Sequence, residues 1–223
     1  MRYAQAHQGV LNAKRILAPI TQGDSITCDA PSRLISWDNY KSGIMKGRYY
    51  PLEYQRLIDL HQYSILMTDG SFFQFFYQFN EIDVLQRARL AYYPRPINTV
   101  DSSDDLMLEA EQALDREDEF LYEHLFNWIE LLEQGMSIPT NTSHIRFDYD
   151  KFVTSHAPAH LQFGGVQNFR LPANFCPLPL AFVQMCQALI EKINPIDSAT
   201  LGFERNNVMK LADQLELIRL AAE

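Results

Sequence analysis

The sequence predicts an α+β fold: a mostly antiparallel sheet of about five or more strands, packed with N-terminal, long acidic and C-terminal helices. One observation is a pair of strand-like segments around Asp69-Gly70, a dipeptide typical of tight hairpin turns. A second is that helical and strand-like segments are grouped and do not alternate, which disfavours a doubly wound parallel sheet. With 223 residues, 47% of them hydrophobic, we expect a single α+β domain over residues 1–223.

The strands are predicted from alternation and from the turn residues that bound them. Polar and aromatic residues alternate towards the end of the second hairpin arm, and Pro94 ends the strand that follows it. On that strand Arg87 and Arg89 share a face with Tyr93. The predicted strands cover residues 62–67, 72–79, 85–93, 144–150 and 159–165, whereas residues 26–37 are ambiguous and residues 43–51 are turn-rich.

The helices are predicted from apolar residues at three- and four-residue spacing. The N-terminal one ends at Pro19, and the long acidic one begins with the capping sequence Ser102-Ser103-Asp104-Asp105. The predicted helices cover residues 1–18, 104–134, 180–193 and 204–221.

The charge is unevenly distributed along the chain. Of the net charge of −9, residues 101–134 carry −11, from twelve acidic residues and one arginine, so the other residues carry +2. An acidic segment is typical of a solvated helix face, and it also suits a protein partner that docks on helix 104–134. Because the rest of the chain is nearly neutral, it could bind an anionic ligand even though the chain as a whole is acidic.

The segment of greatest chemical interest is Ser143-His144-Ile145-Arg146-Phe147-Asp148-Tyr149-Asp150. In a strand, His144, Arg146 and Asp148 lie on one face. If residues 159–165 pair antiparallel with it, His160 joins that face.

Two imidazoles and a guanidinium suit metal-independent cleavage of a phosphodiester. His144 and His160 then serve as acid and base, Arg146 stabilises the developing anionic charge, and Asp148 orients a histidine.

Two other interpretations of these residues stay open. His144, Asp148 and His160 are ligand types that zinc, manganese or iron accept, although Arg146 between two of them would repel a dication. The same residues could also form an ordinary polar surface, with His156 in a turn and Arg146 paired to Asp148.

A second candidate set consists of arginines interleaved with tyrosines. Arg87, Arg89 and Arg95 with Tyr92 and Tyr93 suit phosphate and base contacts, but an exposed edge strand protected by charge explains them better.

Several classes of protein lose support. The sequence lacks the glycine-rich nucleotide loops, the His-Glu-x-x-His motif and the Gly-x-Ser-x-Gly motif. No stretch is long and apolar enough to span a bilayer, and no signal peptide is recognisable. Cys28, Cys176 and Cys186 are widely spaced, which predicts no disulfide framework, buried positions for the last two, and a cytoplasmic location.

Five motifs resemble a family of uncharacterised bacterial proteins, the domain of unknown function 2290. They are Tyr-Tyr-Pro-Leu-Glu-Tyr (49–54), Asp-Gly-Ser (69–71), Ala-Tyr-Tyr-Pro-Arg-Pro (91–96), His-Ile-Arg-Phe-Asp-Tyr-Asp (144–150) and His-Leu-Gln-Phe-Gly-Gly (160–165). The resemblance implies a cytoplasmic bacterial or phage-related origin and no specific activity.

We therefore expect a bacterial protein that binds or cleaves a phosphate-bearing ligand such as RNA through His144, Arg146, Asp148 and His160, without a cofactor. The alternative is a non-enzymatic interaction subunit of a multi-protein bacterial system.

Overall fold

The structure is a computed structural model, and it describes residues 1–42, 50–96, 103–134, 143–166, 169–190 and 208–210. Contacts within the chain define two compact units. The first comprises residues 1–95 and 143–223 and contains the sheet, and the second comprises residues 96–142. The expectation of one domain over residues 1–223 stays a prediction.

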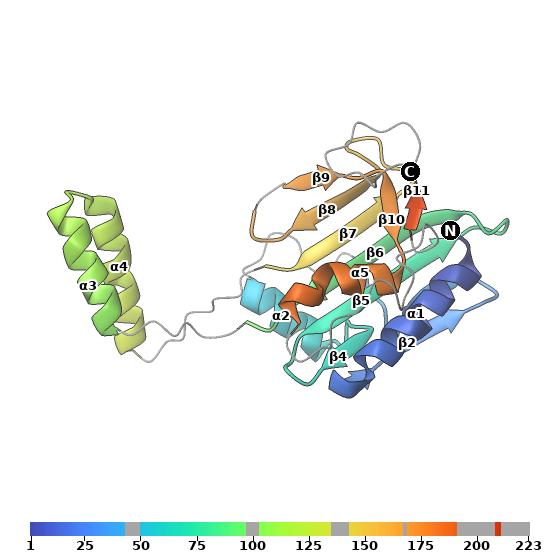
Figure 1. Ribbon diagram of the computed structural model, residues 1–223, viewed down its shortest axis with the longest axis horizontal. Helices are drawn as coiled ribbons and strands as arrows, with labels where there is room; N and C mark the ends of the chain where they lie inside the picture. The colour runs from blue at the N-terminus through green and yellow to red at the C-terminus, as the bar shows by residue number, and fades with distance from the viewer. Residues whose placement is uncertain (43–49, 97–102, 135–142, 167–168, 191–207, 211–223) are drawn as a thin grey trace. The chain divides into compact units, whose positions relative to one another are not determined.

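The first unit is built on a nine-stranded antiparallel sheet (Figure 1). Its main path runs β1-β4-β5-β6-β7-β8-β9, and β3 joins β2 to β5. The predicted α+β class with a mostly antiparallel sheet is confirmed. The strands are β1 (Thr21–Asp24), β2 (Ile26–Asp29), β3 (Leu34–Trp37), β4 (Ile65–Met67), β5 (Phe72–Phe79), β6 (Leu85–Tyr93), β7 (Ile145–Asp150), β8 (Ala159–Phe163) and β9 (Arg170–Pro172).

The predicted hairpin forms between β4 and β5. Gly70 has φ +89°, a left-handed conformation that favours glycine, and the Asp69 carboxylate accepts a hydrogen bond from the Ser71 backbone N–H at 2.8 Å. After this turn, β5 also pairs with β6 along its whole length, and Phe72 on β5 lies opposite Tyr93 on β6.

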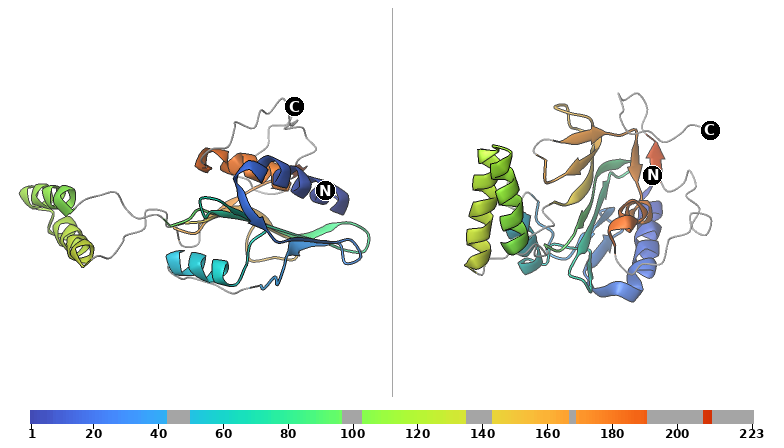
Figure 2. Two further views of the ribbon diagram at one scale, coloured as in Figure 1. Left: turned by 90° about the horizontal axis from the view of Figure 1, so that it is seen from below. Right: turned by 60° about the vertical axis from the view of Figure 1, so that its left-hand side comes forward.

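Two helices cover one face of this sheet, α1 (Tyr3–Leu17) and α5 (Pro179–Cys186), as Figure 2 shows. They come into close contact at Gly9, where an added Cβ would lie 2.9 Å from Cδ of Pro179. Most of the apolar residues at three- and four-residue spacing, from which α1 was predicted, are buried in the structure. Its buried residues are Ala6, Gly9, Val10, Ala13 and Leu17, and they pack in one core with the inward-facing aromatic residues of β5, β6 and β7.

A third helix, α2 (Tyr50–Asp59), packs on part of the opposite face. Its Tyr50, Tyr54 and Leu57 form a second core with Phe72 and Tyr93. The sequence predicted only a turn-rich segment up to residue 51, so this helix was missed. The rest of that face carries mostly polar and charged side chains, with Leu34, Tyr40 and Phe76 at one end.

The second unit is a helical hairpin of α3 (Ser103–Asp115) and α4 (Glu119–Glu133). The prediction of one helix over residues 104–134 is wrong, because Glu117 adopts a left-handed φ of +60° and interrupts it. Asp118 then caps α4, since its carboxylate accepts a hydrogen bond from the Leu121 N–H at 3.0 Å.

The C-terminal part departs from the predicted helices. The helix predicted at 180–193 is α5, followed by one 3₁₀ turn at Gln187–Leu189. Val208–Lys210 forms a short strand, β11, which pairs with β10 (Phe175–Pro177) in a separate two-stranded sheet. These three residues are therefore not helical, and the rest of the helix predicted at 204–221 lies outside the described residues.

Two other expectations concern membrane spans and cysteines. Within the described part of the chain, none of the helices has the length and apolarity to cross a membrane. Cys28, Cys176 and Cys186 are free thiols, and the last two are buried as predicted.

Candidate functional site

Side-chain alternation gives the central strands one apolar and one polar face. On β7, Phe147 and Tyr149 pack in the core beneath α1 and α5, so Arg146, Asp148 and Asp150 lie on the opposite face. The antiparallel register places Arg89 beside Asp148 and His160 on its other side. The predicted pairing of residues 144–150 with 159–165 is confirmed.

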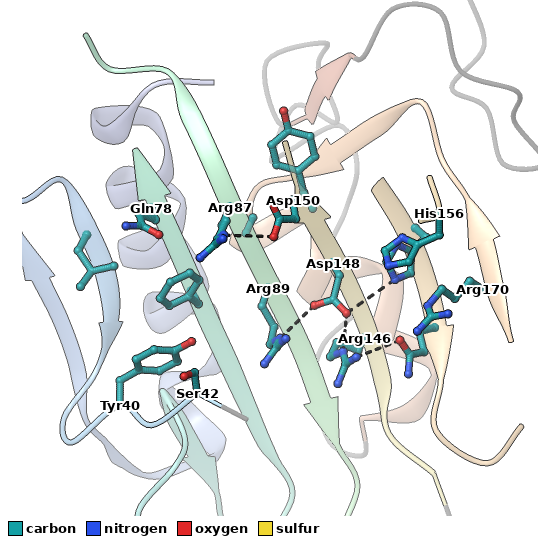
Figure 3. Close-up of a pocket in the computed structure, with 16 residues that line it drawn as sticks. Tyr40, Ser42, Gln78, Arg87, Arg89, Arg146, Asp148, Asp150, His156 and Arg170 are labelled. Atoms are coloured by element: carbon teal, nitrogen blue, oxygen red, sulfur yellow. Dashed lines mark hydrogen bonds and ion pairs between the residues drawn. The ribbon is translucent and has the colours of Figure 1, made fainter. Parts of the chain in front are cut away.

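These side chains line a pocket of about 530 Å³ on the polar face of the sheet (Figure 3). We call it the arginine pocket, because four arginines from three strands line it. Its lining residues are Leu34, Tyr40, Ser42, Phe76, Gln78, Arg87, Ala88, Arg89, Arg146, Asp148, Tyr149, Asp150, His156, His160, Gln162 and Arg170.

Asp148 is the centre of the ion-pair network in this pocket. Its two carboxylate oxygens accept hydrogen bonds from Nε of Arg89 at 3.0 Å and from Nε of Arg146 at 2.7 Å. Burial acts to raise the pKa of Asp148, but the two guanidinium groups outweigh it and hold that pKa below its ordinary value. Arg146 also donates to Oε1 of Gln162 at 2.9 Å, so its guanidinium plane is fixed from two sides.

The arginine pocket carries an excess of positive charge. Arg87 forms an ion pair with Asp150 at 3.1 Å, and Asp148 forms ion pairs with both Arg89 and Arg146. Arg170 is exposed and forms no ion pair with any described residue. Four arginines against two carboxylates leave a net charge of +2, before any histidine is protonated.

His160 lies in the pocket as predicted, at the edge of this network. Its Nε2 is 3.8 Å from the nearer Asp148 oxygen, and its Nδ1 lies 3.2 Å from the carbonyl oxygen of Ala157. Burial is the main cause that lowers the pKa of His160, and the Asp148 charge opposes it. Because a carbonyl only accepts, Nδ1 carries the proton in the neutral ring and Nε2 is the atom that titrates.

The second imidazole in the pocket belongs to His156, which the sequence placed in a turn. Its ring centroid lies 4.8 Å from that of His160 in an edge-to-face arrangement, and its Nδ1 is 3.0 Å from the same Ala157 carbonyl. The loop between β7 and β8 folds back over the sheet and brings His156 there. Its position four residues before His160 was a usable indication, because a short loop returns close to its strand.

His144 does not line the pocket, so the expectation that it converges with His160 is wrong. His144 pairs with Gly164, whereas His160 pairs with Asp148. Four strand positions separate the two rows, a distance of about 13 Å along the sheet. Alternation puts both imidazoles on one face but does not bring them together.

His144 instead occupies the buried zone under α2. Its ring lies 4.9 Å from that of Tyr93, and its Nδ1 is 3.8 Å from the Glu53 carboxylate. Neither ring nitrogen has a hydrogen bond to a described residue. Burial, reinforced by the charge of Arg146, lowers the pKa of His144 to about 4, so the ring is neutral at pH 7.

The second predicted set is divided in the same way. Arg87 and Arg89 line the arginine pocket, but Tyr92 points into the opposite core and Tyr93 is buried beneath α2. Arg95 is exposed beyond the end of β6, close to Gly70, and does not line the pocket.

The metal interpretation finds no support in the geometry. Among the residues that the structure describes, no three histidine, cysteine or carboxylate side chains are grouped to hold an ion. Of the expected ligands, His144 lies apart from Asp148 and His160.

Comparisons with known proteins give one result. Neither a search of curated proteins nor a search of solved structures finds a match. A family model described as "Uncharacterized conserved protein (DUF2290)" matches residues 21–188, most of the chain and all nine strands of the sheet. The chain therefore belongs to this family of uncharacterised conserved proteins, as the sequence motifs indicated.

Proposed function

We propose that the arginine pocket binds a phosphate-bearing ligand, most concretely RNA or another nucleic acid. The observation that carries the proposal is the local charge, +2 in a chain of net −9. Guanidinium groups bind phosphate oxygens through two parallel N–H donors. Asp148 and Gln162 hold Arg146 in place before the ligand arrives, which reduces the entropy lost on binding.

The register supports a particular place for the phosphate. Arg146, Gln162 and Arg170 are aligned across β7, β8 and β9. Neighbouring strands are about 4.8 Å apart, so the two arginines flank Gln162 at a separation of about 10 Å between their backbones. A phosphate above Gln162 can contact Arg146 on one side and Arg170 on the other. Because Arg170 forms no ion pair with a described residue, it can bind the phosphate without breaking an existing ion pair.

The same pocket supports cleavage of RNA, with His156 in the place that the sequence gave to His144. Nε2 of His160 takes the proton from a 2′-hydroxyl, whose oxygen attacks phosphorus while the bond to the 5′-oxygen breaks. Nε2 of protonated His156 gives its proton to the leaving 5′-oxygen. Arg146 stabilises the charge that builds up on the phosphate, and Asp148 orients His160. The products are a 2′,3′-cyclic phosphate and a 5′-hydroxyl.

Fluorescence anisotropy with a labelled 12-nucleotide RNA tests binding. We expect Arg170→Gln and Arg146→Gln each to weaken affinity at least about 5-fold and to make the salt dependence shallower by about one unit of slope. Arg15→Gln is the matched control, since Arg15 is an exposed residue of α1, the helix that covers the other face of the sheet. Equal affinities for all four proteins, or the lack of any binding, would contradict the proposal.

Cleavage is tested separately with single histidine variants. His160→Ala and His156→Ala should each slow cleavage at least about 100-fold while leaving RNA affinity within a few-fold. His7→Ala on α1 controls for contaminating nucleases. A 2′-deoxy oligonucleotide should stay intact because it lacks the attacking hydroxyl. Cleavage by His160→Ala at the unmodified rate would show that the pocket is not the source.

The second candidate function is docking of a partner protein on the α3–α4 hairpin. Its apolar side chains are unusually open: Phe120 is 82% exposed, Leu108 57% and Leu114 54%. Residues 101–134, which include both helices, carry a net charge of −11, so we propose that a basic amphipathic helix covers these apolar side chains.

A labelled Lys/Leu amphipathic peptide tests this second candidate. The peptide should bind the full chain, and Phe120→Ser should weaken it, whereas Leu52→Ser on α2 should not. Equal binding of a scrambled peptide of the same charge would show that only charge is recognised.

A further inference from the structure

The arginine pocket has two chemically different ends. In Figure 3, Tyr40 and Ser42 lie on one side, His156 and Arg170 on the other, and Arg89 and Arg146 between them. The imidazoles and guanidinium groups account for a phosphate. They do not account for the apolar side, to which Leu34 and Phe76 also belong.

The ring of Tyr40 is stacked on that of Phe76, with centroids 4.8 Å apart and planes inclined by 22°. Trp37 packs edge-on against Tyr40 at 5.0 Å. Phe76 is buried beneath, whereas Tyr40 is half-buried and keeps part of its ring surface towards the pocket. We call the two rings the aromatic platform.

The platform is held in place by a buried amide. Gln62, with no exposed surface, donates hydrogen bonds to the carbonyl oxygens of Asn39 and Leu60, both at 2.9 Å. Its Oε1 accepts from the Lys41 N–H at 2.9 Å and from Nε1 of Trp37 at 3.2 Å. Tyr40 is therefore fixed through the residues on both of its sides, and the ring need not be ordered when a ligand binds.

We propose that the aromatic platform stacks an unpaired nucleobase, so that the ligand of the arginine pocket is a nucleotide unit with a free base. This inference rests on the proposed phosphate site and specifies its substrate class. Stacking on an aromatic ring is sequence-tolerant, because every base has a π face. In a duplex both faces of a base are already covered, so duplex nucleic acid cannot use the platform.

The size and charge of the pocket agree with this class of ligand. A volume of about 530 Å³ lies in the range of pockets that hold one small ligand, and it is too small for a double-stranded nucleic acid. The local charge of +2 supplies few phosphate contacts, so stacking has to provide a substantial part of the affinity.

Four probes separate the possible sources of binding: a labelled oligouridylate 12-mer, its duplex with oligoadenylate, an abasic 12-mer with the same backbone, and uridine monophosphate. We expect the unmodified protein to bind the 12-mer more tightly than the abasic strand or the duplex. The mononucleotide distinguishes a free nucleotide from a strand, because a site for free nucleotides binds it as tightly as the 12-mer.

Variants of Tyr40 test the platform itself. Tyr40→Leu should weaken binding of the 12-mer by between about 5-fold and about 100-fold and leave the abasic strand unchanged. Tyr40→Phe keeps the ring and should stay within twofold, as should Tyr122→Leu on α4. Thermal melting of Tyr40→Leu shows whether the variant is folded.

The outcomes separate the two proposals. If Tyr40→Leu binds the 12-mer normally, or if the abasic strand binds the unmodified protein as well as the 12-mer does, the platform is overturned and the phosphate site stands. If no probe binds the unmodified protein, the proposed function itself fails. Equal binding of the duplex would overturn the preference for an unpaired base.

Discussion

The imidazole of His144 lies directly against Gly164, the residue that follows β8. A Cβ atom added to Gly164 would lie 2.7 Å from Cε1 and 2.8 Å from Nδ1 of His144. The ring cannot easily retreat, because Tyr93 and Tyr50 enclose it. The absence of a side chain at position 164 is therefore what gives His144 its place in the sheet.

Gly164→Ala should consequently destabilise the protein by about 1–3 kcal/mol, measured as the free energy of unfolding in urea. In a His144→Ala background the added methyl group has room, and its cost should fall by at least about 0.5 kcal/mol. Gly23→Ala is the control, since a Cβ there meets no atom within 4 Å. Equal costs of Gly164→Ala in the two backgrounds would contradict the close approach.

Replacing His144 by phenylalanine should make the protein less sensitive to mild acid. An unfolded histidine takes up a proton near pH 6.5, but the folded His144 does so only near pH 4, so its presence costs stability as the pH falls between these values. At pH 5 the difference is about 2 kcal/mol.

The free energy of unfolding of His144→Phe relative to the unmodified protein should therefore rise by about that amount from pH 7.5 to pH 5. Stability curves that stay parallel over this range would show that His144 is not held neutral. Independently, the Cε1 proton of His144 in an NMR titration should shift with a midpoint near pH 4.

Asp148→Asn should destabilise the protein most at neutral pH. The pKa of Asp148 is below its ordinary value in the folded state, so its contribution is complete above about pH 4 and is lost as the pH falls through the lower folded value. Losing two charge-assisted hydrogen bonds should cost about 1–3 kcal/mol at pH 7 and progressively less as the pH falls through the folded pKa of Asp148.

The exposed Lys14–Asp24 pair provides the comparison for this prediction. The distance from Nζ of Lys14 to the Asp24 carboxylate, 2.9 Å, is similar to those in the Asp148 ion pairs. Asp24→Asn should nevertheless cost less than about 1 kcal/mol, because solvent screens this pair. A cost for Asp148→Asn that does not change with pH would mean that its charge is not the source.

Tyr77→Phe should cost about 1–3 kcal/mol in the same unfolding measurement. The hydroxyl of Tyr77 donates to the carbonyl oxygen of Pro177 at 2.7 Å inside the core, so its removal leaves that carbonyl without this donor. Tyr63→Phe is the matched change, since the Tyr63 hydroxyl has no hydrogen bond to a described residue and should cost little. Similar costs for the two would argue against a contribution from the Tyr77 bond.

Local patterns were sufficient for much of the fold. The Asp69-Gly70 turn, the strand at 85–93 and the alternation around Arg146 and Asp148 were all predicted, because each depends on a few neighbouring residues. The acidic helix was recognised, but its interruption at Glu117 was not, since acidic residues fit a helix as well as a turn. Helix α2 was missed because two of its three buried residues are tyrosines, Tyr50 and Tyr54, and only Leu57 is aliphatic.

The sequence by itself determined the class of fold and the face on which Arg146, Asp148 and His160 lie, because alternation along a strand is a local property of the backbone. Only the tertiary structure decided which groups share the pocket. Helix α2 covers His144, the loop after β7 brings in His156, and Gln62 fixes the segment that carries Tyr40. These contacts depend on where distant segments pack, and a period-two pattern contains no information about that.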